Sequence, residues 1–533
     1  MVVFYFIILL LVFSNTIAFA TLKTIWPQPQ QVSETGLIFQ LDSLAFYFNS
    51  TGAGSASPIL ADAFQRYRGI IFLHTNAVPA CEKVASSNET ISECIVDVSS
   101  ADETLSLETD VSYKLVVDTT ITITAKTVYG ALNGLESLSQ LVDRGTFIQQ
   151  TSISDFPRYQ IRATMIDTSR HYYPLEAILQ HLDAMAYSKF NVLHWHIVDE
   201  ESFPYQSTKF PEMSAQGAYS PDHVYTVDDI NQVVTYAKNR GIRVIPEFDT
   251  PGHVQQGYRA LDPPILTQCY GETGHPTVTG PLDPTLDDTY SFLTELYAEI
   301  QTIFPDRFVH VGGDEVDTGC WGSNPGIQAY MKAHNLTIYE LETLFEQKLL
   351  KILDAQNSSY IVWQEVFDNG GQIAADTVVD VWKAGMPAGE NFGWQDEMAR
   401  VTKAGFHTIL SAPFYLNKIT YGEDWPTFYG IEPSNFTGGD EATKAGLVGG
   451  IEACMWSEYV DASNFIPRLW ARAAAVGERG WSAQDVTDVN SARDRLHEFR
   501  CKLLARGINA EPLGRGTFCA EEWIPKYERP WLS

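Results

Sequence analysis

The chain has 533 residues, of which 45% are hydrophobic and 19% charged, which is enough for two or three domains and a large core. Its 66 acidic and 36 basic side chains give a net charge of -30 at pH 7 and a pI near 4.7. Such a surface repels nucleic acid and anionic membranes, which argues against both as partners, and it loses much of its self-repulsion in an acidic compartment.

The N-terminus has the pattern of a secretory signal peptide. Residues 2–12 are almost all Val, Phe, Ile and Leu, and Ala18-Phe19-Ala20 offers small residues to a signal peptidase. Because the apolar run is too short to span a bilayer comfortably, we predict a signal peptide over residues 1–20 and no membrane span in the mature chain. No Lys or Arg precedes the run, so a retained anchor stays open as the alternative.

Glycosylation triplets and cysteines fit the same secretory route. Five Asn-x-Ser/Thr triplets predict N-glycosylation, at Asn49, Asn88, Asn335, Asn357 and Asn435. The cysteines predict three disulfides that close short or moderate loops, namely Cys81 with Cys94, Cys269 with Cys320, and Cys501 with Cys519. Cys454 is left over inside an apolar run, which favours a buried thiol over a nucleophile.

Residues 21–155 are predicted to form a small α+β domain. The patterns indicate a strand over 37–48, a helix over 58–67, a hairpin of β-branched residues over 112–124 and a second helix over 128–141. The turn Asp155-Phe156-Pro157-Arg158 marks the predicted boundary.

Residues 156–533 alternate between strand and helix patterns. Eight apolar segments predict strands, at 161–166, 191–196, 242–246, 308–311, 360–363, 378–382, 407–411 and 447–451. Helical patterns lie between most of them, at 175–188, 227–239, 288–303, 338–355 and 394–403, and closing helices follow at 464–481 and 493–506. The predicted fold class is therefore α/β, a (β/α)8 TIM barrel preceded by the small α+β domain.

Polar side chains and tryptophans follow nearly every predicted strand. In such barrels the chemistry lies at the carboxyl ends of the strands. These ends carry Arg170, His194, His196, Asp199, Glu247, Asp249, His253, Asp314, Glu315, Trp363, Glu365, Trp382, Tyr415, Asn417, Trp456 and Glu458. Tryptophan faces pack on the apolar face of a pyranose, and carboxylates and Arg bind its hydroxyls. Any one Trp is more typical of core packing, but three at strand ends favour a sugar pocket.

The densest part of this rim follows the fourth strand, where Gly312-Gly313 precedes Asp314, Glu315 and Asp317. An isolated acidic pair is usually a solvated loop, but the surrounding rim favours a catalytic site here. On an extended backbone the side chains of two sequence neighbours diverge, so Asp314 and Glu315 need not be the opposed carboxylates of an ordinary glycosidase. One could protonate a leaving oxygen while the other orients a group of the substrate.

His194-x-His196 with Asp199 also permits a metal hypothesis, because His-x-His at a barrel strand end can hold zinc. The alternative has one histidine facing the barrel, the other facing a helix, and each held by hydrogen bonds. We favour this alternative and predict no metal.

Six segments carry a resemblance to a known family. They are 167–172 (DTSRHY), 194–199 (HWHIVD), 246–253 (PEFDTPGH), 310–317 (HVGGDEVD), 362–365 (VWQE) and 452–456 (EACMW). In this order they resemble the motifs of eukaryotic lysosomal β-N-acetylhexosaminidases of glycoside hydrolase family 20. The likeness extends over nearly the whole mature chain, including the small α+β domain and the cysteine spacing.

The resemblance implies cofactor-free, retaining hydrolysis of terminal non-reducing β-linked N-acetylglucosamine and N-acetylgalactosamine, assisted by the substrate. Glu315 would be the general acid/base, and Asp314 would orient the 2-acetamido group whose oxygen attacks the anomeric carbon. Tyr415 would hydrogen-bond that oxygen. The implied substrate-binding residues are Arg170, Asp199, His253, Trp363, Trp382, Asn417, Trp456 and Glu458.

The pair Asn417-Lys418 suggests a further specificity. In the mammalian members an Asn-Arg pair here resembles the subunit that accepts negatively charged substrates, and Asp-Leu marks the neutral one. Lys418 keeps the charge but lacks the bidentate fork of Arg. We therefore hypothesise some activity on sulfated or acidic N-acetylhexosaminides, with an ordinary rim lysine as the alternative.

Partners and compartment follow from the resemblance as well, which implies a homodimer acting on glycans in the lysosome, with a secreted share. Two other functions stay open at this point. The His194-x-His196 motif allows a metal-dependent barrel amidohydrolase, and the same scaffold could be a non-catalytic, lectin-like glycan binder. A binder needs no proton donor, so the presence of Glu315, Asp314 and Tyr415 argues against it.

Overall fold

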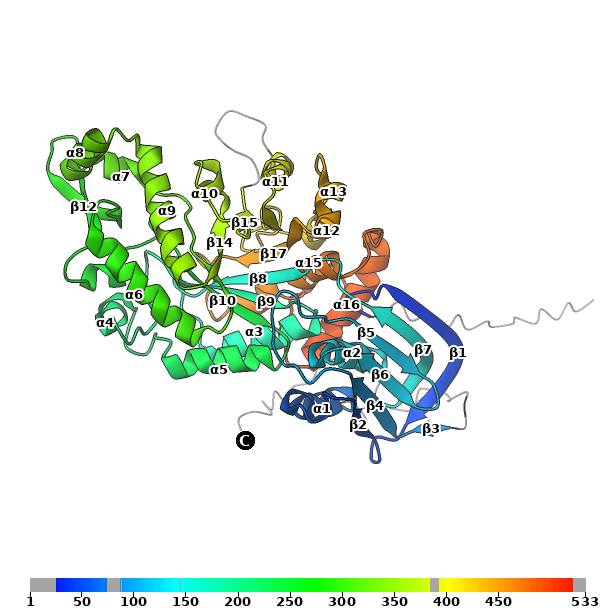
Figure 1. The fold of residues 1–533 in the computed structure, drawn as a ribbon. Coiled ribbons are helices and arrows are strands. Elements are labelled where there is room, and N and C mark those ends of the chain that lie inside the picture. The colour runs from blue at the N-terminus through cyan, green and yellow to red at the C-terminus, as the bar shows by residue number, and fades with distance from the viewer. Residues whose placement is uncertain (1–24, 74–86, 88, 144, 384–392, 521–533) are drawn as a thin grey trace, which may run out of the picture.

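The structure is a computed structural model that describes residues 25–73, 87, 89–143, 145–383 and 393–520. The predicted signal peptide, Cys81 and Asn88 lie outside these residues. Figure 1 shows a sheet domain, coloured blue to cyan, lying beside a larger barrel. Within the described residues no helix combines the length and the apolarity that a membrane crossing requires.

The N-terminal unit is a mixed sheet of seven strands with two helices. Its order is β2-β4-β6-β5-β7-β1-β3. The strands are β1 (Gln31–Leu41), β2 (Tyr47–Thr51), β3 (Thr90–Ile91), β4 (Glu93–Val98), β5 (Tyr113–Val117), β6 (Ile121–Ala125) and β7 (Phe147–Asp155), and the helices are α1 (Pro58–Ile71) and α2 (Val128–Leu141). Side chains of β5 and β6 alternate between buried and more exposed positions, because one face of the sheet packs on α2.

The single strand predicted over residues 37–48 is wrong, because the chain turns between β1 and β2. Asp42 Oδ1 accepts hydrogen bonds from the backbone N–H groups of Leu44 (3.1 Å) and Ala45 (3.0 Å). This local bond offers the backbone a turn in place of a ladder partner. The predicted hairpin and both predicted helices are confirmed, while β3, β4 and β7 were not predicted.

The second unit is a closed barrel of eight parallel strands, as predicted. They are β8 (Ile161–Asp167), β9 (Val192–Val198), β10 (Arg243–Phe248), β13 (Phe308–His310), β14 (Ser359–Trp363), β15 (Val378–Val381), β16 (His407–Leu410) and β17 (Val448–Met455). Nearly all of their residues are buried, since helices cover the outer face and side chains fill the inside. That double burial is why the strands appear in the sequence as continuous apolar runs.

The barrel interior changes from apolar to polar along the strands. Its amino-terminal layer is an apolar cluster that includes Val192, Ile245, Val378 and Ile409. Two residues further along, side chains point the same way again, so His194, Glu247, Asp380 and Ser411 form the next layer. The carboxyl ends of the strands therefore lie above a buried polar layer.

Helices and loops complete the barrel. The main covering helices are α3 (Leu175–Tyr187), α5 (Val227–Lys238), α6 (Asp287–Ile303), α9 (Ile338–Ala355) and α11 (Trp394–Lys403), with shorter α10 (Gln364–Asp368) and α13 (Gly439–Lys444). The helix predicted over 464–481 is two helices, α14 (Phe465–Leu469) and α15 (Arg472–Trp481), because the chain turns at Trp470-Ala471; α16 (Val489–Ala505) follows. A hairpin, β11 (Leu266–Tyr270) and β12 (Pro276–Leu282), and helices α4 (Pro211–Gly217), α7 (Thr318–Ser323), α8 (Pro325–His334) and α12 (Trp425–Tyr429) extend the loops.

Two of the three predicted disulfides are present, Cys269 with Cys320 and Cys501 with Cys519. The first ties β11 to α7, close to the loop after β13. Cys454 is a buried thiol, as predicted. Cys94 is buried in β4 and has no disulfide partner among the described residues, and its predicted partner Cys81 is not one of them.

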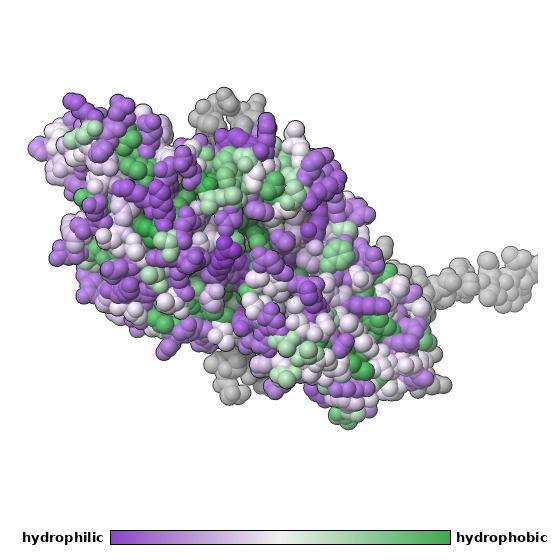
Figure 2. Space-filling model, in the orientation of Figure 1, coloured by the Kyte–Doolittle hydropathy of each residue, from purple (hydrophilic) through white to green (hydrophobic). Residues whose placement is uncertain are grey.

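The face of the molecule in Figure 2 is mainly hydrophilic. Figure 2 shows hydrophilic residues over most of this face, with apolar residues in separate small patches. The four described acceptor asparagines, Asn49, Asn335, Asn357 and Asn435, are all exposed.

Candidate active site

Three tryptophans predicted to wall a pocket are neighbours at the carboxyl ends of the strands. Trp363, at the end of β14, is 1% exposed, and its ring centroid lies 6.3 Å from that of Trp382 and 6.2 Å from that of Trp456. Trp382 and Trp456 are half-buried. The buried ring therefore forms the floor and the two half-buried rings form walls.

The turn after β13 places Asp314 and Glu315. Gly312 and Gly313 have φ values of +73° and +94°, a region that side chains with a Cβ rarely adopt. A Cβ on Gly312 would lie 1.8 Å from Asp249 Oδ1, the atom that accepts a hydrogen bond from the Gly313 N–H (2.9 Å). The two glycines are thus required both by backbone conformation and by the closeness of Asp249.

The two carboxylates diverge, but one histidine faces both. The Asp314 side chain is 9% exposed and that of Glu315 is 60% exposed. His253 Nε2 lies 3.6 Å from Asp314 Oδ2 and 3.7 Å from Glu315 Oε2. Glu315 itself has a φ of +49°, so the turn sends its carboxylate towards solvent while Asp314 stays inside. This arrangement differs from two carboxylates opposed across a substrate.

His253 belongs to a chain of alternating charges. Its Nδ1 lies 3.2 Å from Asp199 Oδ1, and Asp199 Oδ2 pairs with Arg170 Nη2 at 2.8 Å. Burial alone would lower the pKa of His253, but Asp314, Asp199 and Glu315 outweigh it and raise the pKa well above its ordinary value. His253 is therefore a cation at the pH where these carboxylates are ionised.

The charge on His253 acts on Glu315. Its interaction with Glu315 lowers the pKa of that carboxyl below the ordinary value, more than partial burial raises it, and Lys383 and Arg170 add to the lowering. Ligand-free Glu315 is thus held as an anion over much of the pH range. A substrate over this exposed side chain would remove water and favour the protonated form.

The remaining predicted residues lie around the rim. Tyr415 stacks on Trp382 with ring centroids 6.4 Å apart, and burial raises its pKa well above the ordinary value, with a further contribution from Asp314. Tyr415 is therefore a neutral hydroxyl that can donate. The Arg170 guanidinium carbon lies 5.1 Å from the Trp456 ring centroid, and Glu458 is exposed.

Asn417 and Lys418 follow Tyr415 on the same loop. Asn417 is half-buried, and its backbone oxygen accepts a hydrogen bond from Arg468 Nη2 (2.8 Å). Lys418 is exposed, and its Nζ lies 5.9 Å from the Tyr415 ring centroid.

The expected orientation of His194 and His196 is wrong. Both face the barrel interior, because residues two apart on a strand point to the same side. Trp195, between them, points outward and packs on Tyr225 at 5.1 Å. The expected hydrogen bonds are present, since His194 contacts Glu247 (2.8 Å) and Glu452 (3.1 Å) and His196 contacts Glu247 (2.6 Å) and Asp199 (2.7 Å).

These contacts occupy both ring nitrogens of each histidine, so a metal would have to displace a carboxylate contact. A second group, Asp249, His253 and Asp314, also places three potential ligand atoms close together. His253 is held there as a cation, so a metal would first have to displace its proton. A metal at either group would therefore have to displace a carboxylate contact or a proton.

Sequence reasoning missed Lys383 at the rim and the barrel residues His310, Asp380 and Glu452 below it, and it gave no role to Glu247 and Glu365. The signal was available in the strand period for three of them, since His310, Asp380 and Glu247 follow the apolar inward positions Phe308, Val378 and Ile245 by two. Glu365 pairs with Lys383 Nζ (2.7 Å) and accepts a hydrogen bond from Trp382 Nε1 (2.8 Å). Burial and Asp314 raise the pKa of Glu365 to about 7.

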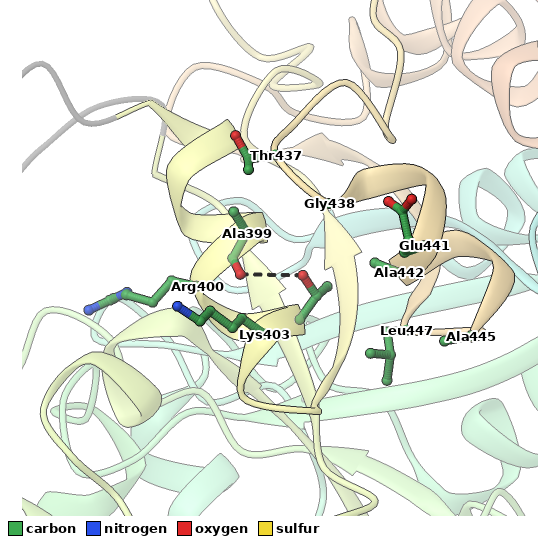
Figure 3. Close-up of a pocket in the computed structure, with 10 residues that line it drawn as sticks. Ala399, Arg400, Lys403, Thr437, Gly438, Glu441, Ala442, Ala445 and Leu447 are labelled. Atoms are coloured by element: carbon green, nitrogen blue, oxygen red, sulfur yellow. Dashed lines mark hydrogen bonds between the residues drawn. The ribbon is translucent and has the colours of Figure 1, made fainter.

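A separate hollow of about 680 Å³ lies between α11 and α13. Its lining includes Arg400 and Lys403 from α11 and Glu441 and Ala442 from α13, and in Figure 3 the two cationic side chains extend away from Glu441. It contains none of the predicted site residues and no converging pair of carboxylates. The strand-end pocket is therefore the candidate active site.

Comparison with known proteins agrees with this geometry. Residues 159–484 match the family model described as glycosyl hydrolase family 20, catalytic domain, and residues 25–141 match one described as beta-acetyl hexosaminidase like. The chain belongs to glycosyl hydrolase family 20. Human beta-hexosaminidase subunit beta is 47% identical over 512 residues, covering 93% of this chain and 90% of the relative. The bovine subunit alpha is 45% identical over 521 residues, covering 95% and 97%.

Solved structures extend the likeness to the fold. The chitobiase of Flavobacterium johnsoniae matches this family 20 chain with a TM-score of 0.79 and 31% identity, over 91% of this chain and 73% of that one. The predicted family, the barrel with its small preceding domain and the enzyme class are thus confirmed. This family 20 chain is a β-N-acetylhexosaminidase, a glycosidase that removes terminal β-linked N-acetylglucosamine and N-acetylgalactosamine, and the comparisons give no support to a non-catalytic sugar binder.

Proposed function

We propose that Glu315 is the general acid/base of this hydrolysis and that Asp314 orients the substrate's own 2-acetamido group as the nucleophile. The observation that carries the proposal is the turn after β13. It buries Asp314 and exposes Glu315 while both face His253, so the chain presents one proton donor and one buried orienting carboxylate. The missing nucleophile then belongs to the substrate.

The two steps balance as follows. The acetamido oxygen bonds to the anomeric carbon, the glycosidic bond breaks, and Glu315 gives its proton to the leaving oxygen. Water then attacks the same carbon, its proton returns to Glu315, and the oxazolinium bond breaks to restore the acetamido group. Two inversions leave the sugar with retained configuration.

The pocket residues support this chemistry. Tyr415 is a neutral donor for the acetamido oxygen, and Trp363, Trp382 and Trp456 provide apolar faces for the ring and the acetamido methyl. Sugar hydroxyls are assigned to Arg170, Glu458 and Asn417, while the buried Asp199 supports Arg170 and His253 from below.

The decisive test is Glu315→Gln. The amide keeps the shape of the side chain but carries no transferable proton, so we expect turnover of aryl N-acetyl-β-glucosaminide to fall by roughly 10²- to 10⁴-fold. Product binding and thermal midpoint should stay near wild type, because this side chain is exposed. Glu212→Gln, an exposed carboxylate on α4, is the matched control. Near-normal turnover of Glu315→Gln would refute the assignment.

We also propose a lysosomal, glycosylated homodimer with a secreted share. The acidic surface favours an acidic lumen, and the exposed Asn49, Asn335, Asn357 and Asn435 are accessible to glycosylation. Asn88, outside the described residues, stays a predicted acceptor. Light scattering of the purified chain tests the dimer, and mass spectrometry before and after deglycosylation tests the glycans.

Activity on acidic substrates is proposed for Lys418. The exposed ammonium lies beside Tyr415 at the rim, where it can meet a 6-sulfate without being desolvated. We expect Lys418→Leu to lose about 3- to 30-fold in kcat/KM on 6-sulfated aryl substrate, which corresponds to roughly one exposed ion pair and one hydrogen bond. Activity on the neutral substrate should be unchanged. Equal loss on both substrates would contradict a role in anion recognition.

A further inference from the structure

Glu247 occupies the centre of the polar layer beneath the pocket. It comes from β10 and is 0% exposed. Its Oε1 accepts a hydrogen bond from Trp363 Nε1 at 2.8 Å, and its Oε2 lies 2.6 Å from His196 Nδ1 and 2.8 Å from His194 Nε2. One carboxylate thus joins the pocket floor to two histidines of the neighbouring strand.

We propose that Glu247 is a positioning residue that fixes the pocket floor through Trp363 and the acid/base through His196, Asp199 and His253. It lies below Trp363 and has no route to the substrate, so it acts through other side chains. The inference rests on the proposed role of Glu315 and extends it inward through His253, Asp199 and His196 to Glu247.

The path to the acid/base is continuous. His196 Nε2 lies 2.7 Å from Asp199 Oδ2, Asp199 Oδ1 lies 3.2 Å from His253 Nδ1, and His253 Nε2 faces Glu315. Strand register creates the first link, since Glu247 is directly paired with His196 in the ladder between β10 and β9. Each link holds one ring or carboxylate in one orientation, because both of its ends are engaged.

Charge alternates along this path. Burial alone would lower the pKa of His196, but Glu247 and Asp199 raise it to about 9. Burial would raise the pKa of Glu247, but the surrounding histidines lower it well below its ordinary value. Anion, cation, anion and cation therefore follow one another from Glu247 to His253 in a medium where such interactions are strong.

Glu452 provides a matched control at the same depth. It is also buried, and its carboxylate contacts the other nitrogen of His194 (3.1 Å) and the Cys454 thiol (3.6 Å). Its partners lie on the side of His194 away from the path to His253. Both carboxylates are buried and contact His194, but the inferred positioning role belongs to Glu247 alone.

The test compares Glu247→Gln, His196→Gln, the double variant and Glu452→Gln in the full-length enzyme. We expect Glu247→Gln and His196→Gln each to lower kcat by roughly 10- to 100-fold, with KM changed less than about threefold, because a displaced acid/base misaligns proton transfer. The kcat of the double variant should be no lower than that of the more impaired single variant, because the two substitutions interrupt the same path. Glu452→Gln should keep kcat within about threefold.

The kcat values of these variants distinguish a positioning role of Glu247 from a purely structural one. Additive losses in the double variant, or an equal loss in Glu452→Gln, would show a purely structural role and overturn the inference. If the thermal midpoint shows that Glu247→Gln does not fold, the test is the comparison of kcat between His196→Gln and Glu452→Gln. Combining Glu247→Gln with Glu315→Gln separates the two proposals. Near-normal kcat in Glu315→Gln alone would refute the proposed acid/base. If Glu247→Gln lowered kcat by the same factor in the Glu315→Gln background as in wild type, only the path from Glu247 to Glu315 would be refuted.

Discussion

At the scale of single residues, the pKa of Glu315 is the quantity that sets the working pH. The substrate has to find Glu315 protonated, so kcat/KM falls as pH rises through the pKa of the free enzyme. His253, Lys383 and Arg170 all lower that pKa. We therefore expect an acidic optimum, whose position is lowered by three neighbouring cations.

Lys383 allows this effect to be measured without altering a substrate contact. Its ammonium pairs with the buried Glu365 carboxylate and lies beside Trp382. Lys383→Met removes one cation that lowers the pKa of Glu315, so the alkaline limb of the kcat/KM profile should move to higher pH. The pKa of Glu365 should also rise, which limits any new negative charge near Asp314.

The control for this prediction is Lys403→Met, an exposed position on α11 that changes net charge equally. Its pH profile should match wild type because a distant surface charge is screened by salt. An identical shift in both variants, or a shift of the Lys383→Met limb to lower pH, would show that Lys383 does not act on Glu315.

At the scale of elements, the turn after β13 determines the site, and its glycines make it testable. Gly312→Ala would place a Cβ into Asp249 and impose a left-handed conformation on Ala. We expect a loss of about 2–5 kcal/mol of unfolding free energy and of most activity, because Asp249 would be displaced from the Gly313 N–H. Urea unfolding and aryl-substrate turnover measure the two effects.

Gly370→Ala isolates the conformational part of that loss. Gly370 has a similar φ of +84°, but a Cβ there meets no atom within 4 Å. It should therefore cost only about 1–2 kcal/mol and leave kcat unchanged. If Gly312→Ala behaved like Gly370→Ala in both assays, the close approach of Asp249 would not matter to the site.

Elements were predictable where burial imposes one pattern. The eight barrel strands are buried on both faces, so each appears in the sequence as an apolar run. The residues that follow the carboxyl end of each run were predicted to form the rim. Strand pairing was not available from the sequence. Glu247 meets His196 because β9 and β10 are adjacent in a particular register, and that register decides which side chains become partners.

Local bonds explain other errors. The Asp42 turn and the break between α14 and α15 interrupt patterns that are apolar on both sides, so periodicity alone joined them. The divergence of Asp314 and Glu315 was expected for an extended backbone, yet it arises from positive φ values at Gly312, Gly313 and Glu315. The residue types of the site were therefore predictable, but the backbone conformation that separates the roles of Asp314 and Glu315 was not.

At the scale of the whole molecule, a buried ion pair joins the two units. Lys189, just after α3, is fully buried, and its Nζ lies 2.9 Å from Asp155 Oδ2 at the end of β7. Trp481 from α15 donates to the same carboxylate at 3.0 Å, and Tyr113 donates to it at 2.7 Å. Because an unpaired buried charge costs several kcal/mol, the sheet domain and barrel should unfold together, in one transition.

That single transition should depend on pH in a definite direction. His194 and His196 have pKa values raised to about 10 and about 9 because Glu452, Glu247 and Asp199 outweigh burial. An unfolded His titrates near about 6.5, so the stability that these cations contribute is complete below that pH and is lost as pH rises towards 9 and 10. Glu365 and Glu397, with pKa values raised to about 7, destabilise the fold as pH rises from about 4.5 to 7.

Carboxylates with lowered pKa values set the opposite limit. Asp199, Glu247 and Glu432 contribute stability above about pH 4 that is lost as they become protonated. The thermal midpoint should therefore be highest between about pH 4.5 and 6.5 and fall on both sides. Scanning calorimetry from pH 3 to 10 at low and at 1 M salt separates the causes, because salt screens surface repulsion from the net charge of -30 but not the buried pairs. A midpoint that stays constant from pH 6.5 to 9 at high salt would show that the buried histidines are not cations.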